Sequence, residues 1–115
     1  MILFARLKSP EPIDCLKMLL EIRHLCPTAP DTLRSFPFRD GDPFVISEYA
    51  PDVFFAGCQP KYQEEIIYQH KKSKESAIKL LSIPTFVLTK SIVLLDLQSL
   101  QSYELHFGQA DSASD

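Results

Sequence analysis

The run Pro51-Asp52-Val53-Phe54-Phe55-Ala56-Gly57-Cys58-Gln59-Pro60 places a short apolar segment between turn-forming neighbours. An apolar segment without alternation, bounded by proline and glycine, is typical of a strand covered on both faces. The glycine that follows the segment predicts a sharp turn, and a turn at a sheet edge can direct side chains toward a metal or a phosphate. The run therefore predicts a buried strand with a candidate site at its carboxyl end, made of Gly57, Cys58, Gln59 and Pro60.

Short apolar runs recur on both sides of this strand. Residues 44–46 are apolar throughout and predict a second strand that is buried on both faces. Polar turns separate the further strands that we expect, at residues 62–68, 77–83, 91–97 and 102–107. The second half of the chain is therefore predicted to be rich in strands.

One main helix is expected ahead of the strands, at about residues 10–24. Ser9 suits the N-cap, and Pro10 and Pro12 fit the first turn, where the missing amide hydrogen of proline costs nothing. Two neighbouring apolar stripes predict that this helix packs on a sheet; they are Ile13, Leu16 and Leu20, and then Cys15, Leu19 and Ile22. The expected fold class is α/β, and His24 at the helix end is expected to interact with the last helical carbonyls.

The segment between this helix and the first strand is expected to be a long, stiff loop. Residues 26–43 carry four prolines, a density that suits neither a helix nor a central strand. Phe36 and Phe38 in this loop need a packing surface, either on the body of the domain or on a partner protein. At the other end of the chain, residues 109–115 have no apolar anchor and are expected to form a disordered acidic tail.

Composition and charge exclude several classes of protein. The chain has 115 residues with 12 Lys and Arg against 15 Asp and Glu, so its formal net charge is -3. This charge argues against a protein that binds nucleic acid mainly through a basic face. The apolar runs are all much shorter than the roughly 20 residues that span a bilayer. The three cysteines form no Cys-x-x-Cys pair and are expected to be free thiols.

The usual sequence signals of catalysis are absent. The chain has three glycines and no glycine-rich phosphate loop or glycine-flanked nucleophile. Glu64 and Glu65 are adjacent on a predicted strand, so they point to opposite faces and cannot form one acid–base pair. The basic run at residues 70–74 lies between two predicted strands and is expected to be a solvated hairpin tip. We therefore expect no enzyme activity.

The end of the first quoted strand resembles the strand-Gly-His-x-His element of calcineurin-like metallophosphoesterases, in which both histidines bind metal. Cys58 and Pro60 stand where those histidines would be. Proline cannot ligate a metal, and a lone cysteine suits poorly the metals that hydrolyse phosphate esters. The resemblance implies a phosphoesterase framework with a degenerate metal motif, no metal and no cofactor. The alternative is a divergent metal-dependent phosphoesterase.

A second resemblance rests on the string from His24 to Leu33. Together with Phe36-Pro37-Phe38 and Asp42-Pro43-Phe44, it resembles the C-terminal part of the small (B) subunits of eukaryotic DNA polymerase delta, in the DNA polymerase alpha/delta/epsilon B-subunit family. The resemblance extends over roughly residues 3–107. We take as the family signature His24, Pro27, Thr28, Ala29, Pro30, Asp31, Thr32 and Leu33.

The resemblance implies a non-catalytic accessory subunit of a replicative polymerase, acting in DNA replication in the nucleus. Its implied partners are the catalytic subunit of DNA polymerase delta and a further small polymerase subunit, with DNA contacted only indirectly and no membrane involved. The implied fold is the C-terminal portion of a calcineurin-like phosphoesterase sandwich. Residues 1–108 would form a partial domain, without the N-terminal OB domain and early strands of the family, and so would be a fragment or a truncated copy.

Overall fold

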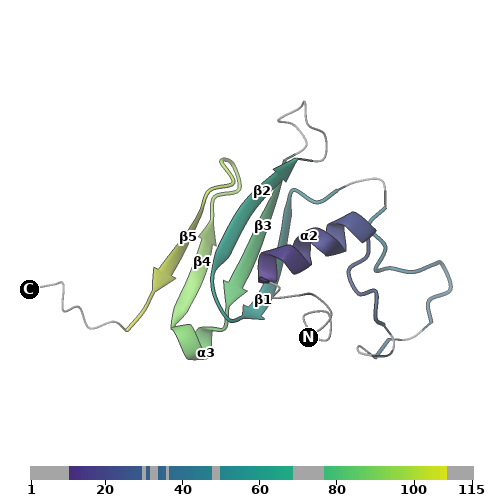
Figure 1. The fold of residues 1–115 in the computed structure, drawn as a ribbon, viewed down its shortest axis with the longest axis horizontal. Coiled ribbons are helices and arrows are strands. Elements are labelled where there is room, and N and C mark those ends of the chain that lie inside the picture. Colours follow the sequence, from purple (N-terminus) through teal and green to yellow (C-terminus); the bar gives the residue numbers. More distant parts are fainter. Residues whose placement is uncertain are drawn as a thin grey trace, which may run out of the picture.

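The chain combines one main helix with a strand-rich second half, as the sequence predicts (Figure 1). The computed structural model describes residues 11–29, 31, 34–35, 37–47, 50–68 and 77–108. The predicted acidic tail, the hairpin tip at residues 70–74, and Phe36 lie outside these residues. The elements, in chain order, are α2 (Pro12–Ile22), β1 (Val53–Gln59), β2 (Gln63–Tyr68), β3 (Ala77–Pro84), α3 (Phe86–Thr89), β4 (Ser91–Leu95) and β5 (Ser102–His106).

Helix α2 begins two residues later than predicted. Its N-cap is Glu11 in an extended conformation, Pro12 opens the first turn, and the Asp14 carboxylate accepts a hydrogen bond from the Glu11 amide. The expectation of an N-cap at Ser9 was therefore wrong, because Glu11 supplies the extended residue from which the helix starts. The helix ends where Arg23 adopts a left-handed conformation, with φ of 53°.

The main sheet has three strands in the order β1-β3-β2. Strand β3 runs parallel to β1, with Phe54 opposite Leu80, and antiparallel to β2, with Ile67 opposite Ile78. Strands β4 and β5 form a separate antiparallel hairpin, which lies beside the main sheet in Figure 1. These five strands confirm the strands predicted at residues 53–56, 62–68, 77–83, 91–97 and 102–107.

The apolar core lies between α2 and one face of the main sheet. Ile13 and Leu16 of the helix pack with Ile78 and Leu80 of β3, and all four side chains are buried. Partly buried side chains from the helix and the flanking strands extend this cluster: Leu20, Ala50, Phe54, Ala56 and Ile67. The first predicted stripe of the helix therefore packs on the sheet, and the second stripe is buried at Cys15 and Leu19 but exposed at Ile22.

Two expectations about burial were wrong. Residues 44–46 do not form a strand, and Val45, which is 50% exposed, makes a single bridge to His24. Strand β1 exists, but Phe55 is 60% exposed because α2 covers the other face of the sheet. The apolar run therefore predicted the strand correctly, but the prediction that both of its faces are buried was wrong. The part of the chain that the structure describes contains no helix long and apolar enough to cross a membrane.

Candidate functional site

The family signature begins at His24, where the chain leaves α2 and enters the long loop. The amides of Arg23 and His24 donate to the carbonyls of Leu20 and Leu19, both at 3.2 Å, and so satisfy the helix end. The His24 ring points instead toward the loop, where Nε2 lies 2.7 Å from Oδ2 of Asp42. The expectation that the ring would bind the helical carbonyls was wrong, because backbone amides already bind them.

The hydrogen bonds of His24 fix its tautomer. Its Nδ1 accepts the amide of Cys26 at 3.0 Å, so in the neutral ring the proton is on Nε2 and is donated to Asp42. The second carboxylate oxygen of Asp42 accepts the amide of Phe44 at 2.9 Å. The hydrogen bonds from His24 and from this amide favour the ionised carboxylate and lower the pKa of Asp42.

These contacts close the base of the long loop. The amide of Leu25 donates to the carbonyl of Phe44 at 2.8 Å, and the amide of Ile46 donates to the carbonyl of Arg23 at 2.9 Å. Above this base lies an open pocket of about 400 Å³, lined by His24, Pro27, Ala29, Ser35, Pro37, Phe38, Gly41, Asp42, Pro43 and Phe44. We call residues 24–44 the signature loop.

None of the described residues of the signature loop is fully buried. Pro27 and Asp31 are exposed, Thr28 and Ala29 are half-buried, and Pro30, Thr32 and Leu33 lie outside the described residues. Phe38, for which the sequence left two packing surfaces open, is exposed. The body of the domain therefore does not bury this aromatic ring.

The candidate site at the end of β1 is a bulge rather than a sharp turn. The pairing of β1 with β3 shifts register between Ala56 and Gln59, and Cys58 has a left-handed φ of 56°. The strand then continues to Gln59, whose carbonyl accepts the amide of Thr85 at 2.9 Å. The expected end of the strand at Gly57 was wrong, because the bulge lets β1 rejoin β3.

Gly57, Cys58 and Pro60 are exposed on this bulge, and Gln59 is half-buried. The side-chain amide of Gln59 donates to the carbonyl of Gly57 at 2.8 Å and so stabilises the bulge itself. Among the described residues, no group of three or more His, Cys, Asp or Glu side chains lies together in an arrangement that suits a metal.

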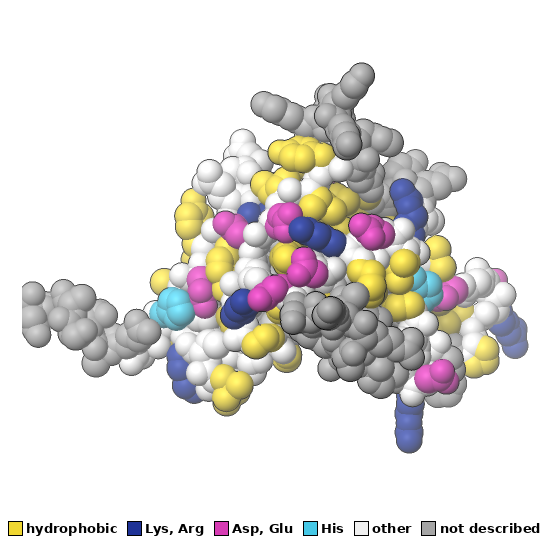
Figure 2. Space-filling model, viewed as in Figure 1, with side chains coloured by type: hydrophobic (Ala, Val, Ile, Leu, Met, Phe, Trp, Pro, Cys, Tyr) yellow, Lys and Arg dark blue, Asp and Glu magenta, His cyan; other side chains and the backbone are white. Residues whose placement is uncertain are grey.

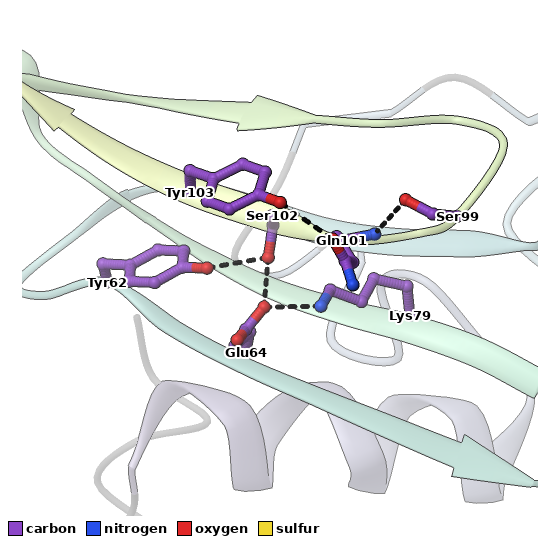
Figure 3. Close-up of polar contacts among 7 residues, drawn as sticks. All are labelled: Tyr62, Glu64, Lys79, Ser99, Gln101, Ser102 and Tyr103. Carbon is purple, nitrogen blue, oxygen red and sulfur yellow. Dashed lines mark hydrogen bonds and ion pairs between the residues drawn. The ribbon is translucent and has the colours of Figure 1, made fainter.

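A polar cluster that the sequence did not predict connects the main sheet to the β4–β5 hairpin. It consists of Tyr62, Glu64, Lys79 and Ser102, and we call it the inter-sheet cluster. Figure 3 shows the Glu64 carboxylate between Lys79 and Ser102, on the side of the sheet away from α2. Nζ of Lys79 donates to Oε2 of Glu64 at 2.5 Å, and the hydroxyl of Ser102 donates to the same oxygen.

The inter-sheet cluster contains the one charged side chain that is almost fully buried among the described residues. The Lys79 side chain is 5% exposed, whereas its partner Glu64 is 43% exposed. The hydrogen bonds from Lys79 and Ser102 lower the pKa of Glu64. The hydroxyls of Tyr62 and Ser102 are 2.7 Å apart, which extends the cluster to the segment before β2. Because a buried charge is costly without a partner, the ionised Glu64 carboxylate stabilises this packing.

The prediction that Glu64 and Glu65 point to opposite faces of their strand is confirmed. Glu64 faces the β4–β5 hairpin, whereas Glu65 faces α2 and pairs with Lys17 at 2.7 Å. Acidic and basic side chains are intermixed on the face drawn in Figure 2. A second pair on the outside of the chain joins Lys61 to Glu11, also at 2.7 Å.

Comparison with known families assigns the chain to a class. Residues 4–64, just over half of the chain, match the DNA polymerase alpha/epsilon B-subunit family. The match includes α2, the signature loop, β1 and the first residues of β2. The chain belongs to this B-subunit family.

The similar proteins within this class are small subunits of DNA polymerase delta. The chain is 41% identical over 100 residues to the DNA polymerase delta small subunit of Arabidopsis thaliana, covering 87% of this chain and 22% of that protein. It is 33% identical over 105 residues to the DNA polymerase delta small subunit of Oryza sativa, covering 91% of this chain and 24% of the relative. The protein of the same name from Saccharomyces cerevisiae is 34% identical over 90 residues, which cover 78% of this chain and 18% of the relative. The chain thus spans about a fifth of the length of these relatives.

Proposed function

We propose that the chain is a non-catalytic accessory subunit of the replicative DNA polymerase delta, or a partial copy of one. The observation that carries this proposal is the 41% identity to the Arabidopsis thaliana small subunit over 87% of the chain. The proposed partners are the catalytic subunit of DNA polymerase delta and a further small subunit, the proposed compartment is the nucleus, and DNA is contacted through those partners.

We further propose that the signature loop contributes a contact surface for the catalytic subunit. Three observations support this role: the family match includes the loop, Phe38 is exposed on it, and its base is held closed by hydrogen bonds. Exposed aromatic side chains on a preformed surface are typical of protein interfaces. The His24–Asp42 pair lines the pocket and holds the loop residues on its two sides together.

The test is co-purification of the tagged 115-residue chain with the catalytic subunit of DNA polymerase delta from the same organism. We expect the chain to retain this catalytic subunit and not those of polymerases alpha and epsilon. Asp42→Ala removes the acceptor of His24 and Phe44, so the loop opens and retention falls several-fold. The matched control is Asp96→Ala, because Asp96 also accepts turn amides, from Gln98 and Ser99, but lies at the hairpin turn. Equal retention of all three polymerases, or of none, would contradict the proposal.

We propose that the framework around β1 is a phosphoesterase framework without metal ligands. Hydrolysis of phosphate esters in such enzymes needs a metal-bound water, and Pro60 offers no ligand atom while Cys58 lies exposed on a bulge. We therefore expect no manganese-dependent hydrolysis of aryl phosphates at neutral pH, measured beside an active metallophosphoesterase. Turnover that co-purifies with the chain and disappears in Cys58→Ala would instead support the divergent phosphoesterase.

A further inference from the structure

Strand β5 has an outer edge opposite the one that pairs with β4. At the two ends of the β4–β5 ladder, the amide of Phe107 donates to the carbonyl of Lys90 at 2.7 Å, and the amide of Asp96 donates to the carbonyl of Gln101 at 2.9 Å. Hydrogen-bonded pairs occur at every second residue of an antiparallel ladder, so Gln101, Tyr103, Leu105 and Phe107 are the residues of this strand segment whose backbone groups point toward β4. The backbone groups of Glu104 and His106 therefore point away from β4, toward an edge that pairs with no other strand in the described part of the chain.

The side chains of β5 divide into an apolar face and a charged face. Tyr103, Leu105 and Phe107 alternate on one face, and all three are exposed. Glu104 and His106 lie on the other face, with 3.5 Å between the carboxylate and the ring nitrogen. Natural edge strands are usually protected by charged side chains, especially lysine, by proline or by a bulge. On β5 the ionisable side chains are Glu104 and His106, which attract rather than repel each other. The five residues of β5 contain neither lysine nor proline, and their register with β4 is regular.

This edge is complementary to itself. In an antiparallel pair of two copies with Leu105 on the two-fold axis, Glu104 of each copy lies directly opposite His106 of the other. Both residues have outward-pointing backbone groups, so each such pair is a hydrogen-bonded pair. On the other face Tyr103 lies opposite Phe107 of the second copy, and the two Leu105 side chains meet. The register centred on Glu104 instead sets two carboxylates against each other, which is unfavourable.

We propose that β5 binds β5 of a second copy of this chain, forming a symmetric dimer with a continuous four-stranded sheet. A two-fold interface uses the same patch on both copies, as this strand requires. Cross-strand charge and aromatic pairs each contribute roughly 0.2–1 kcal/mol beyond the backbone hydrogen bonds. The interaction concerns β5, the last strand that the structure describes, and does not depend on the proposed polymerase partner.

Disulfide trapping tests both the pairing and its register. In a Cys26→Ser/Cys58→Ser background, Leu105→Cys places two thiols at a non-hydrogen-bonded pair, where the distance between Cα atoms suits a disulfide. We expect rapid formation of a covalent dimer on mild oxidation. Leu97→Cys is the matched control, because Leu97 is more exposed (79%) than Leu105 (43%) but lies in the hairpin turn, away from the edge. Cross-linking of Leu97→Cys as fast as Leu105→Cys, or of Glu104→Cys in place of Leu105→Cys, would overturn the proposal.

Sedimentation equilibrium on the unmodified chain gives a measurement that needs no variant. We expect a monomer–dimer equilibrium, and a strictly monomeric chain at all accessible concentrations would overturn the proposal. Glu104→Lys should weaken the dimer about tenfold, because it disrupts two symmetry-related charge pairs. Mixing the two single variants Glu104→Lys and His106→Glu should restore dimerisation as a heterodimer, because each copy then supplies the opposite charge to the other. A role of Glu104 confined to its pair with His106 in the same copy predicts no rescue, since that pair is broken in both variants. Circular dichroism of each variant confirms that the fold is retained.

Discussion

Leu80→Ala is expected to be among the most destabilising single substitutions in the chain. Leu80 is the central residue of the core, since it is fully buried and lies on the middle strand of the main sheet. It packs with Ile13 and Leu16 of α2, so the helix and the sheet share this contact. Removing a buried leucine leaves a cavity and costs about 2–5 kcal/mol. We expect a loss of about 3 kcal/mol, from a total that is typically only about 5–15 kcal/mol.

The measurement is urea unfolding followed by circular dichroism, with Leu97→Ala as the control. The urea concentration at the midpoint of unfolding should be lower for Leu80→Ala than for the unmodified chain. The slope of the free energy of unfolding against urea concentration should stay unchanged, because the same surface is exposed on unfolding. Leu97→Ala should change the free energy of unfolding by less than about 0.5 kcal/mol, since a substitution on the exposed turn leaves no cavity. A loss below about 1 kcal/mol for Leu80→Ala would contradict the placement of the core.

The elements that the sequence predicted are those set by local patterns. Helix α2 follows from its apolar stripes and the prolines at its start, and the five strands follow from apolar runs separated by turns. Residues 44–46 show the limit of this reasoning. Their apolar run pairs only with the segment after α2, at the base of the signature loop, and that pairing joins residues about twenty positions apart. Local composition cannot distinguish this single bridge from a strand.

The candidate sites show the same limit. The sequence identified the family signature and the motif from Gly57 to Pro60. It did not predict that Asp42 would bind His24 or that β1 would continue through a bulge. It missed the inter-sheet cluster because Ser102 reaches Glu64 from a hairpin 38 residues away. One signal was available: Lys79 is the one charged residue of a largely apolar strand. A lysine in a buried strand needs a charged or polar partner, and Glu64 lies on the neighbouring predicted strand.

Glu64→Gln is expected to destabilise the chain by leaving the Lys79 charge buried without its carboxylate. Removal of one partner of a fully buried ion pair costs about 3–5 kcal/mol. Because Glu64 itself is 43% exposed, water can partly replace it. We therefore expect a loss of about 2 kcal/mol, which lowers the melting temperature of a domain of this size by roughly 10 °C. Glu65→Gln, the neighbouring carboxylate on the opposite face, pairs with a more exposed lysine and should cost less than about 1 kcal/mol.

A rescue variant and a pH titration separate the ion pair from other effects of the Glu64→Gln substitution. Lys79→Met in the Glu64→Gln background removes the buried charge and should recover most of the lost stability, since an apolar side chain of similar length fills the same space. The pKa of Glu64 is lower in the folded chain than in the unfolded chain. Its contribution to stability is therefore complete above the ordinary glutamate pKa of about 4.3 and is lost as the pH falls through the lower folded value. Glu64→Gln should lack this part of the acid dependence. If Glu64→Gln and Glu65→Gln melt at the same temperature and show the same acid dependence, Glu64 does not neutralise the buried lysine.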